Sequence, residues 1–87
     1  MNIDLMNVAS AKDLHRLFKE RLGFPGFYGM NWDAFWDAVT GLTDMPDRLI
    51  LNNWEMFLNK LPEEGKTLAA IIIRYNDLNA QKKIICK

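Results

Sequence analysis

The sequence has a single cysteine, Cys86, and no long apolar run. One cysteine excludes an internal disulfide and a cysteine-rich metal site. No apolar stretch approaches the roughly 18 residues that a membrane-spanning helix needs. The start of the chain, Met1-Asn2-Ile3-Asp4, lacks the basic residues and apolar stretch of a signal peptide. We therefore expect no membrane association and a location in a reducing cytoplasm.

Basic residues are absent from the middle of the chain. The 87 residues have a formal net charge of zero, but no Lys or Arg lies between Leu22 and Asp47. This aromatic-rich stretch contains the acidic residues Asp33, Asp37, Asp44 and Asp47. Such a segment indicates a surface for a cationic partner. An ordinary solvated helix face explains the charge alone equally well.

The first half of the chain predicts a strand followed by two helices in one small domain, residues 1–87. Alternating apolar residues from Ile3 toward Val8 favour a short strand. Ser10 is a good N-cap for a helix over 11–22, which Gly23 ends. The segment 23–29 is a loop because it has three glycines and a proline, although it also carries three aromatics.

The second half of the chain predicts further helices and strands. Asn31 is a suitable N-cap for a helix over 32–40, which Gly41 stops. Leu49-Ile50-Leu51 forms a buried strand, and a brief helical turn covers 54–58. A helix over 62–79, with Pro62 in the favoured first position, then leads to a strand over 83–86. This order predicts an α/β fold, a small parallel sheet with helical crossovers.

The helix over 32–40 is amphipathic when wound at 100° per residue. Its apolar stripe consists of Trp32, Phe35, Val39 and Leu42. Its opposite side consists of Asp33, Asp37 and Thr40, with Trp36 between the two. Two carboxylates at i and i+4 repel by roughly 0.2–0.5 kcal/mol. Helix stability therefore does not explain the pair.

A catalytic site is hard to assemble from these residues. His15, the only histidine, lies beside Leu14 in the first helix, where we expect it to pack or cap. Cys86 is expected to act as a small buried hydrophobe. Asp33 and Asp37 could form a carboxylate pair, but no metal-ligand cluster, cationic clamp or oxyanion donor accompanies them. An enzyme using these two aspartates is thus an alternative without support, and no cofactor or metal is expected.

Direct nucleic-acid binding is also disfavoured. Affinity for nucleic acid comes largely from basic side chains that neutralise phosphates. The aromatic segment that could stack bases contains no Lys or Arg and would repel phosphate.

What remains is an aromatic loop that leads directly into an acidic helix. Protein interfaces favour aromatic anchors around a few charged groups. The alternative for Phe27, Tyr28 and Trp36 is that each simply covers the core. For any one of them this is at least as good an explanation, but for all three together it is weaker.

The run from Phe27 to Gly41, FYGMNWDAFWDAVTG, is closely similar to the signature of the barstar family, Y-Y-G-x-N-x-D-A-x-W-D-x-x-T-G. Asp13-Leu14-His15 and the order of predicted elements also match. The resemblance implies a three-stranded parallel sheet packed by three to four helices. It further implies an inhibitor whose loop and second helix enter the cationic active-site groove of a guanyl-specific, barnase-like ribonuclease.

The resemblance also implies roles for individual residues. Asp37 matches the principal inserting carboxylate, Asp33 its acidic support, and Asn31 the N-cap. The residues expected at the partner surface are Phe27, Tyr28, Gly29, Asn31, Asp33, Trp36, Asp37, Thr40, Gly41, Asp44 and Tyr75. The expected complex is one-to-one with an extracellular-type ribonuclease, and the free protein is expected to be a monomer.

Several departures from the family pattern leave a second partner class open. Phe27 replaces the first tyrosine of the signature, so a hydroxyl is lost. An acidic position of the last helix falls around Tyr75, and Asp77 replaces it only if the register shifts. The neutral net charge weakens long-range steering. The alternative is therefore an immunity protein for a different toxin or a non-nuclease partner. By analogy, the Met45–Pro46 bond is a candidate cis peptide.

Overall fold

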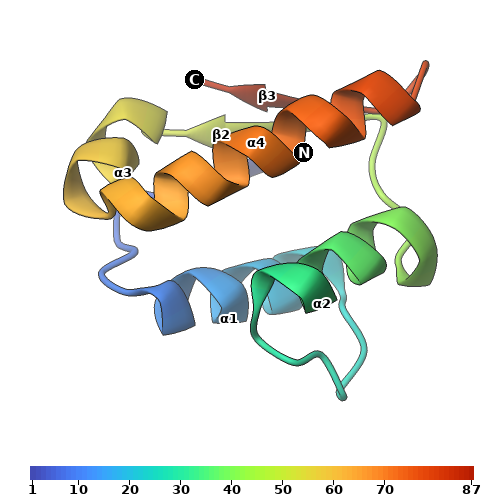
Figure 1. The fold of residues 1–87 in the computed structure, drawn as a ribbon, viewed down its shortest axis with the longest axis horizontal. Coiled ribbons are helices and arrows are strands. Elements are labelled where there is room, and N and C mark those ends of the chain that lie inside the picture. Colours follow the sequence, from blue (N-terminus) through green and yellow to red (C-terminus); the bar gives the residue numbers. More distant parts are fainter.

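The computed structural model describes all residues, 1–87, and shows three strands and five helical segments (Figure 1). In chain order they are β1 (Asn2–Asp4), α1 (Ala11–Leu22), α2 (Trp32–Asp37), the π-helix η1 (Ala38–Leu42), β2 (Arg48–Asn52), α3 (Trp54–Lys60), α4 (Pro62–Leu78) and β3 (Lys83–Cys86). None of these helices combines the length and apolar character needed to cross a membrane.

The three strands form one parallel sheet in the order β1-β2-β3. Parallel neighbours need crossover connections, which share one handedness. Because the strand order never reverses, both crossovers place their helices on the same side of the sheet. Accordingly, only one sheet face is buried, through Ile3, Leu49, Leu51 and Ile84. The predicted α/β fold with a three-stranded parallel sheet is confirmed.

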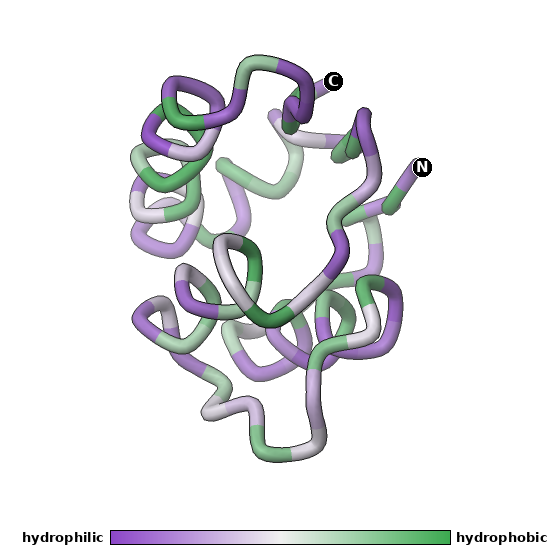
Figure 2. Tube along the Cα trace, turned by 90° about the vertical axis from the view of Figure 1, so that its right-hand side faces the viewer, coloured by the Kyte–Doolittle hydropathy of each residue, from purple (hydrophilic) through white to green (hydrophobic).

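One continuous core of twenty residues lies between the sheet and the helices. Aromatic rings from different elements fill its centre. Phe18 of α1 and Phe35 of α2 have ring centroids 5.0 Å apart, and Phe57 of α3 is fully buried. Along each helix, hydrophobic and hydrophilic residues alternate (Figure 2), as expected for helices that turn one side to this core. Phe35 thereby ties the short helix α2 to the rest of the molecule.

Side chains occupy backbone groups on both edge strands. In β3, the amide of Asn76 donates to the carbonyl of Ile84 at 2.9 Å and accepts from its N–H at 2.8 Å. In β1, Arg21 donates to the carbonyl of Asn2 at 3.0 Å. Asn76 thus takes the place of a neighbouring strand at one position of the outer edge.

The predicted ends of α1 are confirmed. Ser10 is its N-cap, with Oγ accepting from the N–H of Asp13 at 3.2 Å. Gly23 follows its last residue with φ of 69°, a left-handed conformation that glycine adopts without strain. Pro62 begins α4, as its fixed φ and missing N–H favour.

Three local predictions are corrected. The first strand stops at Asp4, because this side chain accepts from the N–H of Met6 and turns the chain before Val8. The Met45–Pro46 bond is not cis. It lies in an irregular segment, without the tight turn that typically holds a cis proline.

The third correction concerns the helix expected over 32–40. The α-helix ends at Asp37, and Gly41 does not stop the winding, which continues as the π-helix η1 to Leu42. Its hydrogen bonds span five residues, as in the bond from the N–H of Thr43 to the carbonyl of Ala38. These wider turns break the 100° periodicity. Leu42 therefore leaves the apolar stripe and is 54% exposed.

We expect Asn76→Ala to lower the free energy of unfolding by about 1–3 kcal/mol, because two partly buried backbone groups of Ile84 lose their partner. Urea denaturation measures this change. Asn59→Ala, at an exposed position of α3, is the control and should change stability by less than about 0.5 kcal/mol. Equal effects of the two substitutions would contradict a structural role for the Asn76 contacts.

Candidate functional site

The loop between α1 and α2 projects from the end of the molecule that lies away from the sheet (Figures 1 and 2). Its two adjacent aromatics have different surroundings. Tyr28 is buried, and its hydroxyl lies 2.6 Å from Nδ1 of His15. Phe27 is 78% exposed. Tyr28 therefore anchors the loop to α1, while Phe27 presents its ring to solvent.

His15 lies at the junction of α1, the loop and α2. It is 3% exposed, and its ring centroid lies 4.5 Å from that of Trp32. Burial lowers the pKa of His15, and the carboxylate of Glu64 partly opposes this shift. Burial also disfavours the charged form of Tyr28 and therefore raises its pKa. The pair is therefore held neutral near pH 7 and packs the loop against the helices, as the sequence predicted for His15.

Hydrogen bonds of the Asn31 side chain fix the start of α2. Oδ1 of Asn31 accepts from the N–H of Ala34 at 2.8 Å, which caps the helix. Its Nδ2 donates to the carbonyl of Gly29 at 3.2 Å. A Cβ at Gly29 would lie only 3.1 Å from this nitrogen, so the glycine leaves room for the cap. The expectation that Asn31 is the N-cap is confirmed.

Two tryptophans one helical turn apart hold α2 against α4. Nε1 of Trp32 donates to Oε2 of Glu64 at 2.7 Å. The guanidinium carbon of Arg74 lies 4.3 Å from the ring centroid of Trp36, in a cation–π contact. These contacts join segments that are more than 30 residues apart in the chain.

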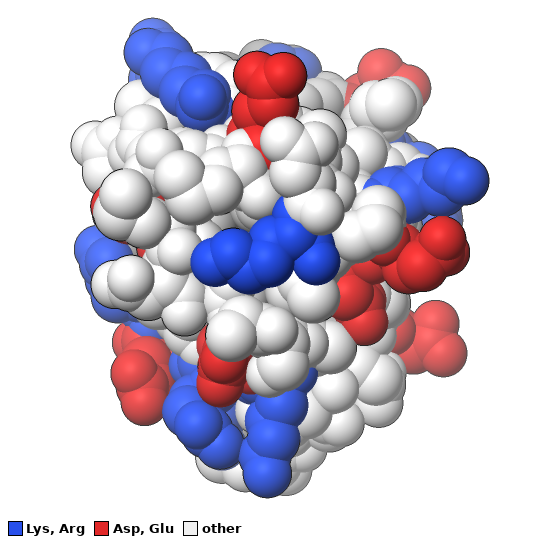
Figure 3. Space-filling view, turned by 90° about the vertical axis from the view of Figure 1, so that its left-hand side faces the viewer, with Lys and Arg blue, Asp and Glu red and all other residues white.

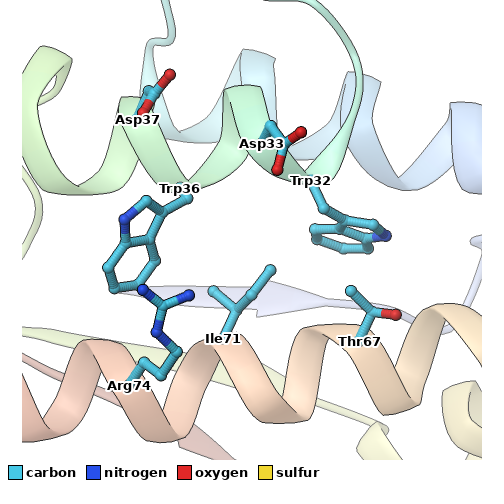
Figure 4. A pocket seen from close by; sticks show the side chains of 7 residues that line it. All are labelled: Trp32, Asp33, Trp36, Asp37, Thr67, Ile71 and Arg74. Carbon is cyan, nitrogen blue, oxygen red and sulfur yellow. The ribbon is translucent and has the colours of Figure 1, made fainter.

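A groove of about 430 Å³ separates the exposed sides of α2 and α4. In Figure 4, Trp36 and Arg74 meet at one end, Trp32 and Thr67 lie at the other, and Ile71 projects between them from α4. The lining residues are Trp32, Asp33, Trp36, Asp37, Thr67, Ile71 and Arg74.

A second hollow, of about 250 Å³, lies between the loop and the end of the α2–η1 segment. It is lined by Pro25, Phe27, Tyr28, Gly29, Ala34, Asp37 and Leu42. Asp37 is the one residue that lines both this hollow and the groove. In Figure 4 it lies on the side of α2 that is farther from α4. Asp37 therefore stands on a ridge with a hollow on either side.

The carboxylates of Asp33 and Asp37 are exposed and engage no other side chain. The structure contains one ion pair, between Lys82 and Asp44 at 3.3 Å. No hydrogen bond is made to the side chain of Asp33 or Asp37 in the structure. Both acids are consequently available to a cationic partner.

Of the remaining residues expected at the partner surface, three are exposed and one is buried. Thr40 and Gly41 are exposed in η1, and Oγ1 of Thr40 donates to the carbonyl of Trp36 at 2.6 Å. Asp44 is exposed beside Lys82, outside both hollows. Tyr75 is corrected: it is 2% exposed within the core and does not reach this surface.

Sequence reasoning missed Arg74 and placed Leu42 on the apolar stripe. Thr67, Ile71 and Arg74 follow one another at i, i+4 and i+7, so the sequence predicts that they share one side of the helix. The sequence does not predict which other segment faces that side. The acidic side chain expected around Tyr75 is absent from the groove, where the side chain from this part of α4 is the cationic Arg74.

Elsewhere the charges are mixed. On the face around α3, acidic and basic side chains alternate over a largely uncharged surface (Figure 3). No group of three or more His, Cys, Asp or Glu side chains gathers as a metal site would require. The segment from α2 to Asp47 thus differs from this face in carrying negative charge alone.

The sequence is similar to a known protein family and to a curated protein. The sequence model of the family described as "Barstar (barnase inhibitor)" matches residues 1–87. A curated protein of Bacillus subtilis (strain 168), named "Putative ribonuclease inhibitor YrdF", is 43% identical over 53 residues. That alignment covers 61% of this chain and 58% of the relative, which is less than two thirds of the relative's length.

We expect Asp37→Asn to raise the free energy of unfolding by roughly 0.2–0.5 kcal/mol, because it removes the repulsion from Asp33 without breaking any contact. Urea denaturation tests this, with Thr40→Val as a neighbouring exposed substitution that does lose a hydrogen bond. A loss of more than about 1 kcal/mol in Asp37→Asn would show that the acid is structural.

The lowered pKa of His15 predicts acid-sensitive stability. The unfolded chain takes up a proton near the usual value of 6.5, whereas the folded chain takes it up only at lower pH. The stabilisation is therefore complete above pH 6.5 and declines below it, by at most about 1.4 kcal/mol per pH unit. Unfolding free energies from pH 7.5 to 5.0 should fall less in His15→Gln than in the unsubstituted protein. Parallel pH profiles would contradict this prediction.

Proposed function

The chain belongs to the barstar family of barnase inhibitors, and we propose that it blocks a guanyl-specific, barnase-like ribonuclease. In this proposal, α2 and the aromatic loop fill the active-site groove of the enzyme. The comparisons support inhibition of a ribonuclease as the function. They do not support an enzyme that uses Asp33 and Asp37.

The observation that carries the mechanism is the position of Asp37. Its carboxylate is exposed, unpaired, and lies on a ridge between two hollows. An enzyme that cleaves RNA needs a cationic groove for phosphate. A projecting carboxylate fits such a groove and forms charge-assisted hydrogen bonds with its arginine and histidine side chains. Asp33, one turn earlier, adds a second negative charge to the same surface.

The hollows on either side of Asp37 give this surface a shape that can complement a partner. The two rims of the ribonuclease active site would enter these two hollows. The exposed ring of Phe27 and the half-buried ring of Trp36 would pack against the rims. Because Tyr28, Asn31 and Trp32 already hold the loop and α2 in place, little ordering is required on binding.

A single ridge implies a one-to-one complex, and occupation of the groove excludes RNA. The chain would serve as an immunity protein in a bacterial cytoplasm, where it would protect the cell from a secreted nuclease. Phe27 favours a second candidate, a different toxin or a non-nuclease partner, because its exposed ring lacks the hydroxyl of the family signature.

The direct experiment is inhibition of purified barnase by the unsubstituted protein and by Asp37→Ala. We expect one-to-one inhibition that weakens as salt is raised, and a loss of at least about 30-fold in Asp37→Ala. That loss corresponds to about 2 kcal/mol, the usual contribution of one interface hot spot. The barnase–barstar complex is one of the examples from which this usual value is known.

Asp47→Ala is the matched control, because it removes the same charge from an exposed position outside both hollows. It should change inhibition by less than about threefold, since distant surface charges are screened. Failure of the unsubstituted protein to inhibit would redirect the proposal to the second partner class. Equal losses in the two variants would reject Asp37 as the inserting residue.

A further inference from the structure

Arg74 is a cation in an otherwise acidic groove, and no carboxylate neutralises it. Its guanidinium lies 4.3 Å from the Trp36 ring centroid, and no hydrogen bond is made by its side chain. The one ion pair of the structure lies elsewhere, between Lys82 and Asp44. Asp33 and Asp37 line the same groove, yet neither comes within salt-bridge distance of Arg74.

The contact with Trp36 positions this cation without using its hydrogen-bonding capacity. An arginine carries five N–H donors in a planar fork. The contact holds the guanidinium over the ring of Trp36, and none of its donors is used in a hydrogen bond within the protein. The arrangement therefore suits a bidentate hydrogen-bonded pair between Arg74 and a carboxylate of the partner.

The groove arranges three charges in a fixed pattern. The acids Asp33 and Asp37 come from α2, and Arg74 comes from α4, with Ile71 projecting between the helices (Figure 4). A partner that is basic over the whole area would satisfy both acids but would place like charge against Arg74. Contact with a partner would exclude water from the exposed Arg74 and would thereby strengthen that penalty.

We propose that Arg74 is the specificity-determining residue of this surface, and that it selects a protein partner with a carboxylate opposite it. This carboxylate lies beside the cationic groups that meet Asp33 and Asp37. The inference rests on the proposed function and narrows it: among ribonucleases with a basic groove, the preferred one carries an acidic residue on the rim that faces α4.

The test uses barnase and a set of its variants in which each basic residue of the groove rim is changed in turn to Glu. Dissociation constants are measured for the unsubstituted protein, Arg74→Gln and Arg74→Glu. For a rim that is basic opposite α4, Arg74→Glu should bind at least about tenfold more tightly than the unsubstituted protein. For the enzyme variant whose new Glu lies opposite Arg74, the unsubstituted protein should bind more tightly than Arg74→Glu.

Lys66→Glu provides the matched control, because it makes the same charge change on an exposed residue of α4 that does not line the groove. It should alter binding by less than about threefold for every enzyme variant, which separates a local contact from long-range attraction. Arg74→Gln, which removes the charge without reversing it, should give an intermediate affinity. Thermal unfolding of each variant verifies that the fold is retained.

Two failures are distinguishable. If Asp37→Ala abolishes binding while both Arg74 variants remain within about twofold of the unsubstituted protein for every enzyme, the proposed function stands and the role of Arg74 is rejected. If no enzyme variant is bound, or Asp37→Ala binds normally, the proposed function fails, and the inference about Arg74 fails with it.

Discussion

The candidate surface depends on the anchoring of a helix that is too short to exist alone. An isolated helix of six residues is unstable in water, because nucleation costs more than so few hydrogen bonds return. Here α2 is capped by Asn31, buried through Phe35 and tied to α4 through Trp32 and Glu64. The loop before it is held by the contact between Tyr28 and His15. Residues that point inward thus fix the positions of the acids that point outward.

Much of the fold follows from local chemistry that a sequence displays openly. Ser10 and Gly23 delimit α1, Asn31 begins α2 and Pro62 begins α4, because caps and proline act within one turn. The order of elements then leaves a parallel sheet as the arrangement that buries one apolar face. At the site, the exposed acids of α2 were predictable from helical periodicity alone.

The rest depends on packing between distant segments and on hydrogen-bond geometry. The π-helix η1 carries no residue pattern that periodicity detects, and it moves Leu42 from the expected core to the surface. The groove exists because α4 lies beside α2, so the role of Arg74 could not be predicted from either helix by itself. Tyr75 illustrates the same limit: adjacent to Arg74 in sequence, it turns into the core.

The side chains bound to the sheet edges have a consequence for contacts between copies of the protein. Bare edge strands invite other copies to add strands, which leads to aggregates that grow without limit. Asn76 on β3 and Arg21 on β1 take up backbone groups on which such growth would begin. The exposed ring of Phe27 lies on the loop at the opposite end of the molecule from the sheet (Figure 1). Each side chain blocks its edge at a single residue, so a second copy that paired there would first have to displace Asn76 or Arg21.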